Sequence, residues 1–182
     1  MTPAFAIEPL APAHRRKGFC CGVAELDYYL SDLVDEHVAR GLGGCFATLG
    51  EMNVVVGYYT LSAVNLPLGE LPPEVRERLP RRPLLAAAWM GRLAVDRRFR
   101  GQGFGGAMIM DAAARSARAE PKAHALIVDA KDQIAAAFYR RLEFRRLLSC
   151  PGALFLPLAT AVGALAGEGS WPAPGNVRRF TG

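Results

Sequence analysis

The sequence predicts an α/β protein in which a mixed β-sheet carries helices on both faces. Apolar runs of strand length alternate with segments of helical periodicity, in the order β-α-β-β-α-β-α-β-α-β. Residues 124–130 are apolar almost throughout, which is typical of a parallel strand buried on both faces. Apolar residues make up 51% of the 182-residue chain and charged residues 21%, so we expect a folded globular protein.

The N-terminal part predicts a strand, a helix and a hairpin. Residues 4–10 are expected to form the first strand. Apolar side chains recur at helical spacing across 22–40, and Gly41 is expected to end that helix. β-branched and aromatic residues on either side of a turn at 50–53 predict a hairpin of two strands, 45–49 and 53–63.

The remainder of the chain alternates strands and helices. Pro72 and Pro73 open a short helix that ends before Pro80. We then expect a central strand at 84–95, a helix at 107–119, a strand at 124–130, a helix at 133–142, a final strand at 147–156 and a short helix after it. No internal repeat or domain boundary is evident. One domain is therefore expected over residues 1–166, followed by a mobile Gly/Pro-rich tail at 167–182.

Several classes of protein are excluded by what the sequence lacks. The N-terminus has no basic, apolar signal segment, and the longest unbroken apolar run, 84–90, is far too short to span a bilayer. The four cysteines have neither Cys-x-x-Cys spacing nor nearby histidines. We therefore expect reduced core thiols, no metal site, no membrane contact and a cytoplasmic protein.

A glycine-rich segment follows the central strand and precedes the alanine-rich helix. It reads Arg100, Gly101, Gln102, Gly103, Phe104, Gly105, Gly106. Glycines let the backbone approach an anion closely, and the first N–H groups of a helix point at it with the favourable end of the dipole. The segment is therefore predicted to hold the phosphates of a cofactor, against the alternative of a glycine turn that binds nothing.

The spacing of these glycines narrows the choice of cofactor. The Gly-Lys-Ser/Thr ending of a P-loop is absent. Gly101-x-Gly103-x-x-Gly106 matches the dinucleotide fingerprint formally, but the acidic residue near the required distance, Glu120, follows a helix instead of a strand. Arg100-x-x-Gly103-x-Gly105 instead resembles the acyl-CoA pyrophosphate loop of the GNAT N-acetyltransferases, whose mixed sheet splays open to admit the cofactor.

Further segments resemble one branch of that superfamily, the acetyltransferase toxins of type II toxin–antitoxin systems. They are Phe19-Cys-Cys-Gly22, Glu25-Leu-Asp27, Val56-Gly-Tyr-Tyr-Thr-Leu-Ser62, Gly91-Arg-Leu-Ala-Val-Asp96, Val128-Asp-Ala130 and Phe138-Tyr139. The matches run from about residue 19 to 155. The resemblance implies acetyl-CoA as co-substrate, the α-amino group of aminoacyl-tRNA as acceptor and a ribbon-helix-helix antitoxin as partner. We also expect a homodimer.

The resemblance assigns roles to particular residues. Tyr139 would protonate the departing CoA thiolate, although an aromatic core residue beside Phe138 is the alternative. The backbone N–H groups of Leu93, Ala94 and Val95 would hold the pantetheine arm and polarise the thioester carbonyl. Arginines near the acceptor side would contact the tRNA acceptor stem, and an ordinary arginine-rich surface is the alternative. They are Arg76, Arg78, Arg81, Arg82 and Arg92.

No general base is evident in the sequence. His14, His37 and His124 are expected to be structural or exposed, which leaves Glu70, Glu74 and Asp129 as water-relayed candidates. An α-amino group has a pKa of about 7.7–8.0 and is partly neutral near pH 7, whereas a lysine side chain near 10.4 needs a base far more. This argument favours an α-amine as acceptor.

Two other functions remain open at this stage. A GNAT enzyme acting on a small amine or a protein N-terminus would line its cleft with acidic residues instead of arginines. A non-catalytic acyl-CoA-binding scaffold would have no need of Tyr139 beside a complete glycine loop.

Overall fold

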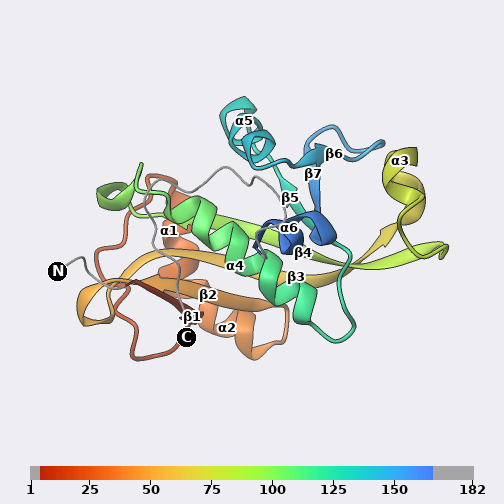
Figure 1. The fold of residues 1–182 in the computed structure, drawn as a ribbon. Helices are drawn as coiled ribbons and strands as arrows, with labels where there is room; N and C mark the ends of the chain where they lie inside the picture. Colours follow the sequence, from red (N-terminus) through yellow and green to blue (C-terminus); the bar gives the residue numbers. More distant parts are fainter. Residues whose placement is uncertain (1–4, 166–182) are drawn as a thin grey trace. The chain divides into compact units, whose positions relative to one another are not determined.

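The computed structural model describes residues 5–165, in which backbone hydrogen bonds join seven strands in the order β1-β2-β3-β4-β5-β7-β6 (Figure 1). Parallel and antiparallel pairs occur together, so the expected mixed α/β sheet is confirmed. The described residues form two compact units, 5–62 with Gly91–Ile109 and Ala63–Met90 with 110–165. Strands β3 (Val55–Pro67) and β4 (Leu84–Val95) and helix α4 (Phe104–Arg118) each contribute to both. The predicted tail, 167–182, lies outside the described residues.

The first unit contains β1 (Ala6–Pro9), β2 (Gly44–Leu49) and the adjoining parts of β3 and β4. The pairs β1–β2 and β2–β3 are antiparallel. The helices beside these strands bury Leu30 and Val34 against Val55 and Tyr58, because their apolar stripe faces the sheet (Figure 1).

The prediction of a single helix at 22–40 is wrong in one respect. A π-helical turn, Tyr29–Leu33, separates α1 (Ala24–Tyr28) from α2 (Val34–Ala39). A π turn accommodates one extra residue, and the apolar spacing alone does not reveal it. Such turns occur frequently at functional sites, so this one is considered again below.

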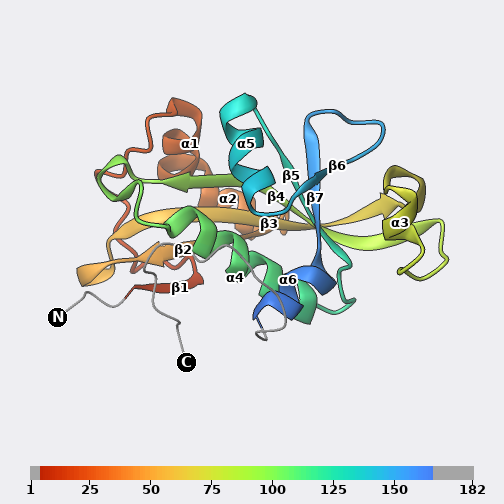
Figure 2. The same cartoon turned by 45° about the horizontal axis from the view of Figure 1, so that its top comes forward.

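The second unit contains β5 (Ala125–Asp129), β6 (Arg145–Arg146), β7 (Ala153–Pro157) and the adjoining parts of β3 and β4. Strands β4 and β5 are parallel, whereas β5 and β7 are antiparallel. Helices α5 (Gln133–Arg141) and α6 (Leu158–Leu165) follow β5 and β7, so they leave the sheet at opposite ends (Figure 2). A short α3 (Pro73–Arg76) follows Pro72, as expected.

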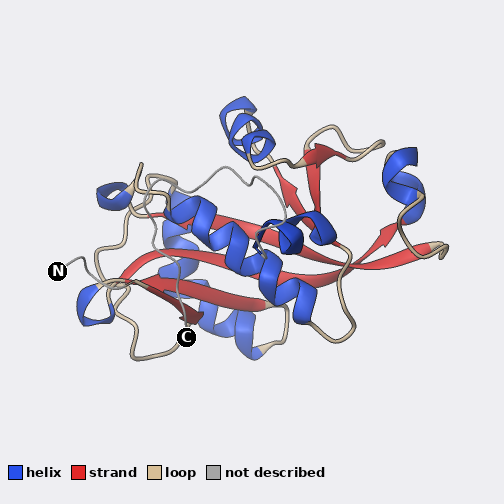
Figure 3. Ribbon diagram, in the orientation of Figure 1, coloured by secondary structure: helices blue, strands red, loops and turns tan. Residues whose placement is uncertain are grey.

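Three expected boundaries and one chemical expectation need correction. Of the strand expected at 147–156, only residues 153–156 belong to a strand, β7, because residues 150–153 form a turn in which the Ala153 N–H donates to the Cys150 carbonyl at 3.0 Å; β6 precedes the expected range. Strand β3 extends to Pro67, and α4 begins at Phe104 instead of residue 107. Figure 3 distinguishes the helices from the strands by colour. Cys21 and Cys45 are buried thiols, but Cys20 and Cys150 are exposed.

Two absences hold for the described residues. None of the helices in 5–165 is both long and apolar enough to cross a membrane. Over the same residues, histidine, cysteine and acidic side chains do not gather in any group suited to a metal ion.

Candidate functional site

The segment that leads from β4 into the glycine loop is held by one buried carboxylate. Asp96, whose side chain is 1% exposed, accepts hydrogen bonds from the backbone N–H groups of Cys20 at 3.2 Å and Arg98 at 3.0 Å. The Arg98 guanidinium adds two contacts of 2.9 Å. The pKa of Asp96 is lowered to about 2, mainly because Arg98 donates hydrogen bonds to its carboxylate. Sequence reasoning assigned Asp96 no role, although its place at a strand end before two arginines suits a cap.

The backbone of the glycine segment has the conformation that an anion site requires. Gly101 and Gly103 adopt φ angles of +74° and +86°, a region that favours glycine. The Gly103 carbonyl accepts from the Ala107 N–H at 3.1 Å, so the helix starts at once after it. The N–H groups of the first turn, including those of Gly105 and Gly106, have no intrahelical acceptor. A Cβ added at Gly101 or Gly106 would meet no atom within 4 Å, so both positions border open space.

The side chains of this segment hold it in place. The Arg100 guanidinium donates to the Cys21 carbonyl, and the Gln102 amide donates to the Arg98 carbonyl at 3.4 Å. Phe104 was predicted to contact the cofactor, but its side chain is buried, with its ring centroid 4.6 Å from that of Phe5. Phe104 therefore anchors the helix start, and only its backbone N–H remains available to a ligand.

The predicted pantetheine strand lies past the end of the β4–β5 pairing. The parallel register covers Ala88, Trp89 and Met90, and Leu93 to Val95 follow beyond it. Ala94 is buried, and its carbonyl would lie 2.9 Å from a Cβ built on Gly57. The glycine in β3 thus allows the backbone of β4 to approach closely.

Tyr139 belongs to the second unit, on helix α5. The Asp132 carboxylate caps this helix by accepting from the Ala135 N–H at 2.7 Å. The Tyr139 side chain is buried, with its ring 5.4 Å from Phe138 and 5.3 Å from Phe144. Burial, with a smaller contribution from the Asp129 carboxylate, raises the pKa of Tyr139 to about 12. The phenol is therefore protonated near pH 7 and can donate, and its packing also fits the alternative of a core aromatic residue.

The predicted acceptor-side arginines belong to both units. Arg76, Arg78, Arg81 and Arg82 lie in the second unit, where none of them forms an ion pair with any residue of 5–165. Arg92 belongs to the first unit, where its guanidinium lies 3.8 Å from the centroid of the Tyr29 ring. Sequence reasoning did not anticipate this stack.

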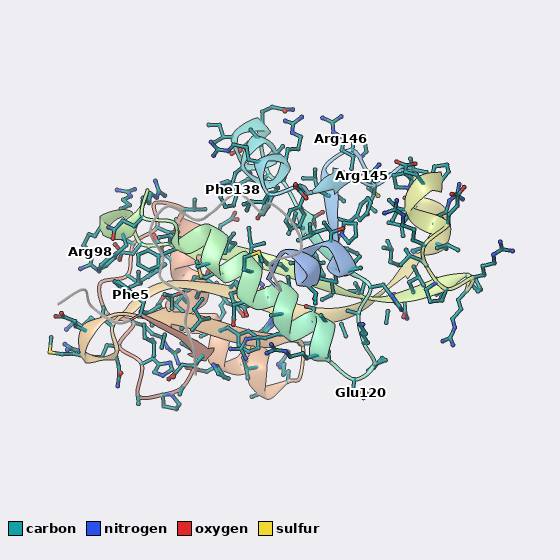
Figure 4. The ribbon with its side chains drawn as sticks, in the orientation of Figure 1. Phe5, Arg98, Glu120, Phe138, Arg145 and Arg146 are labelled. Carbon is teal, nitrogen blue, oxygen red and sulfur yellow. The ribbon has the colours of Figure 1, made fainter. Side chains whose placement is uncertain are left out.

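The candidate bases are mostly engaged in structural contacts. Glu70 accepts from the backbone N–H of Ser149 at 3.1 Å and from its hydroxyl at 2.9 Å, and Glu74 pairs with Arg145 on β6 (Figure 4). The His14 ring is buried and contacts the Ala11 N–H and the Glu8 carboxylate. His14 is thus structural, as expected.

The sequence matches a known family model and curated relatives. The acetyltransferase (GNAT) domain model matches residues 43–146. A tRNA-acetylating toxin of Mycobacterium tuberculosis is 31% identical over 128 residues, which cover 69% of this chain and 75% of the relative. A probable toxin TacT of Sinorhizobium fredii is 27% identical over 165 residues, which cover 85% and 91% of the two chains.

Solved structures share the fold over nearly their whole length. AtaT complexed with acetyl-methionyl-tRNAfMet is 25% identical with a TM-score of 0.79, covering 90% of this chain and 99% of AtaT. A tyrosine-to-phenylalanine mutant of KacT is 26% identical with a TM-score of 0.76, and AtaTR bound with acetyl-CoA is 27% identical with a TM-score of 0.73. Each of these two covers 88% of this chain, which spans 98% of the matched chain.

Proposed function

The chain belongs to the GNAT family of acetyltransferases, and we propose that it transfers acetyl from acetyl-CoA to the α-amino group of aminoacyl-tRNA, thereby blocking translation. The proposal is supported by the relative that acetylates tRNA and by the AtaT complex with acetylated methionyl-tRNA. Binding of acetyl-CoA is supported by the start of α4. There, two left-handed glycines precede N–H groups that have no acceptor within the helix.

Each group has a defined task in the reaction. The glycine segment and the first turn of α4 bind the pyrophosphate of acetyl-CoA, and the backbone of Leu93 to Val95 binds the pantetheine arm. The neutral amine attacks the thioester carbonyl carbon, so a C–N bond forms and the C–S bond breaks. The amine releases a proton to solvent, and the Tyr139 hydroxyl donates one to the departing CoA sulfur. Tyr139 then regains its proton from water.

Tyr139 is suited to donate a proton briefly, and not to remain as a charged phenolate. A thiol has a pKa near 8.5, whereas that of Tyr139 is raised to about 12, so the phenolate formed on donation is unfavourable and is reprotonated at once. One of the similar structures is a KacT mutant in which a tyrosine is replaced by phenylalanine, which supports a functional role for a tyrosine in this family. The assignment to Tyr139 rests on the Phe138-Tyr139 resemblance.

The partners follow from the same family. We propose that a ribbon-helix-helix antitoxin neutralises the enzyme, that the enzyme forms a homodimer and that it acts in the cytoplasm, where charged tRNA is used. Two relatives are named as toxins, and this supports the proposal of an antitoxin partner. The proposed tRNA contacts are arginines, because guanidinium groups bind phosphates well: Arg76, Arg78, Arg81, Arg82 and Arg92.

Transfer of labelled acetyl from acetyl-CoA to a pool of aminoacylated tRNAs tests the proposal. We expect label in the charged tRNA, its loss after mild alkaline deacylation and none in uncharged tRNA. Label found instead on small amines or protein N-termini, with none on charged tRNA, would refute the proposal and favour that rival activity.

A further inference from the structure

A small cavity in the first unit is lined by polar residues, two of which have a buried polar atom without a hydrogen-bond partner in the protein. Its volume is about 180 Å³, and it is lined by Tyr29, Leu33, Glu36, His37, Arg40, Leu42 and Arg92. At about 30 Å³ per molecule of liquid water, it has room for about six waters. The cavity therefore suits a group the size of a ribose or an amino acid.

The π turn supplies part of the lining of this cavity. Tyr29 and Leu33 begin and end the turn, and His37 follows four residues later on the same helical face. The Tyr29 side chain is 2% exposed, yet its hydroxyl has no hydrogen-bond partner, and neither has the buried Nε2 of His37. The neighbouring Tyr58, whose ring stacks on Tyr29, donates its hydroxyl to the Leu26 carbonyl at 2.7 Å. Leaving a buried polar group unpaired is unfavourable, so a ligand that accepts from the Tyr29 hydroxyl would gain free energy.

The charges in the lining narrow the choice of ligand. Arg40 is neutralised by Glu36 at 2.6 Å, whereas Arg92 stacks on Tyr29 and has no carboxylate partner in residues 5–165. Burial, and next the charge of Arg92, lower the pKa of His37, so its ring is neutral near pH 7. A phosphate would meet the Glu36 carboxylate as well as one free cation. A neutral group with acceptor oxygens fits the site better.

We propose that this cavity binds the aminoacyl ester at the 3′ end of the acceptor, with Arg92 and the Tyr29 hydroxyl donating to its oxygens. The inference rests on the proposed function and adds to it the groups that select the acceptor. Arg92 directly precedes Leu93 in β4, so this cavity adjoins the backbone assigned to the pantetheine arm. A nearby cation also lowers the pKa of a bound amine, which favours an α-amine near 8 over a lysine near 10.4.

The test is Tyr29→Phe, with Tyr28→Phe as the matched control. Tyr28 is the preceding residue, is 56% exposed and does not line the cavity. Tyr29→Phe removes a hydroxyl that bonds to nothing in the protein, so we expect an unchanged or higher melting temperature. We expect the KM for aminoacyl-tRNA to rise about three- to tenfold, with the KM for acetyl-CoA unchanged. Arg92→Met removes a charged donor and should raise the KM for aminoacyl-tRNA about ten- to a hundredfold.

The possible outcomes separate this inference from the proposed function. Wild-type transfer to charged tRNA, with unchanged acceptor KM in Tyr29→Phe and Arg92→Met, would overturn the cavity assignment alone. A lower melting temperature in Tyr29→Phe without a change in acceptor KM would make the tyrosine a packing residue, with the same consequence. No wild-type transfer to charged tRNA would overturn both proposals. A raised acceptor KM in Tyr29→Phe but not in Tyr28→Phe would establish the cavity as the acceptor site.

Discussion

Replacement of Asp96 by Asn tests whether one carboxylate stabilises the approach to the glycine loop. The fold lowers the pKa of Asp96 from 3.8 to about 2. At roughly 1.4 kcal/mol per pKa unit, this corresponds to about 2 kcal/mol. Some of this is screened by solvent, because the Arg98 side chain that contacts the carboxylate is 60% exposed. We therefore expect Asp96→Asn to lower the free energy of unfolding by about 1–2 kcal/mol at pH 7.

The dependence on pH gives an independent check on the same carboxylate. Since the folded-state pKa lies below that of the unfolded chain, the stabilisation is complete above about pH 4 and is lost as the pH falls through about 2. Urea unfolding of wild type and Asp96→Asn, followed from pH 7 to pH 2, should give curves that converge in acid. Asp35→Asn is the control, because Asp35 is 76% exposed in its pair with Arg16 and should contribute less than about 1 kcal/mol. A difference between wild type and Asp96→Asn that stays constant down to pH 2 would refute the reasoning.

Three further predictions concern the proposed reaction. Tyr139→Phe should bind acetyl-CoA as wild type does but lose about 10²–10⁴-fold in turnover, measured as acetyl transfer; undiminished turnover would return Tyr139 to a packing role. Gly106→Ala should retain or gain up to about 1 kcal/mol in stability, since its Cβ meets no atom within 4 Å, yet weaken acetyl-CoA binding in calorimetry. An unchanged affinity would place the pyrophosphate elsewhere. Arg81→Glu with Arg82→Glu should flatten the salt dependence of tRNA binding by about 0.7–0.9 in log–log slope per lost phosphate contact, and Arg118→Glu, a single charge reversal, serves as the control. Equal slopes in the two proteins would exclude these arginines from the RNA contact.

Much of the fold was predictable because its signals are local. The strand at 84–95 has the expected bounds, since Pro83 and Asp96 enclose a segment that is apolar except for Gly91 and Arg92. The helix at 133–141 follows an Asp132 cap and its apolar spacing. The π turn was not predictable, because a single added residue leaves apolar side chains on the buried face at nearly the same spacing.

The candidate site was predictable where it depends on the backbone. A helix follows the glycine segment as expected, although it begins at Phe104 instead of residue 107, and Gly101 and Gly103 adopt left-handed angles. Side-chain roles were harder to predict, because they depend on neighbours distant in sequence. Phe104 packs on Phe5, and Arg92 stacks on Tyr29. Neither contact leaves a periodic signal in the chain.

The π turn also has a consequence for how acceptor preference could change among relatives. An α-helix advances about 100° per residue, so removing one residue from 29–33 would restore an ordinary helix and rotate everything before it relative to everything after it. The buried stripe of α2 would keep its packing, while Tyr29 would turn away from His37. Ser31 and Asp32 are exposed, but the same rotation would turn Leu30 away from Val55 and Tyr58. A single-codon deletion in this turn would therefore change the lining of the cavity and disturb the core of the first unit together, so the two cannot vary independently.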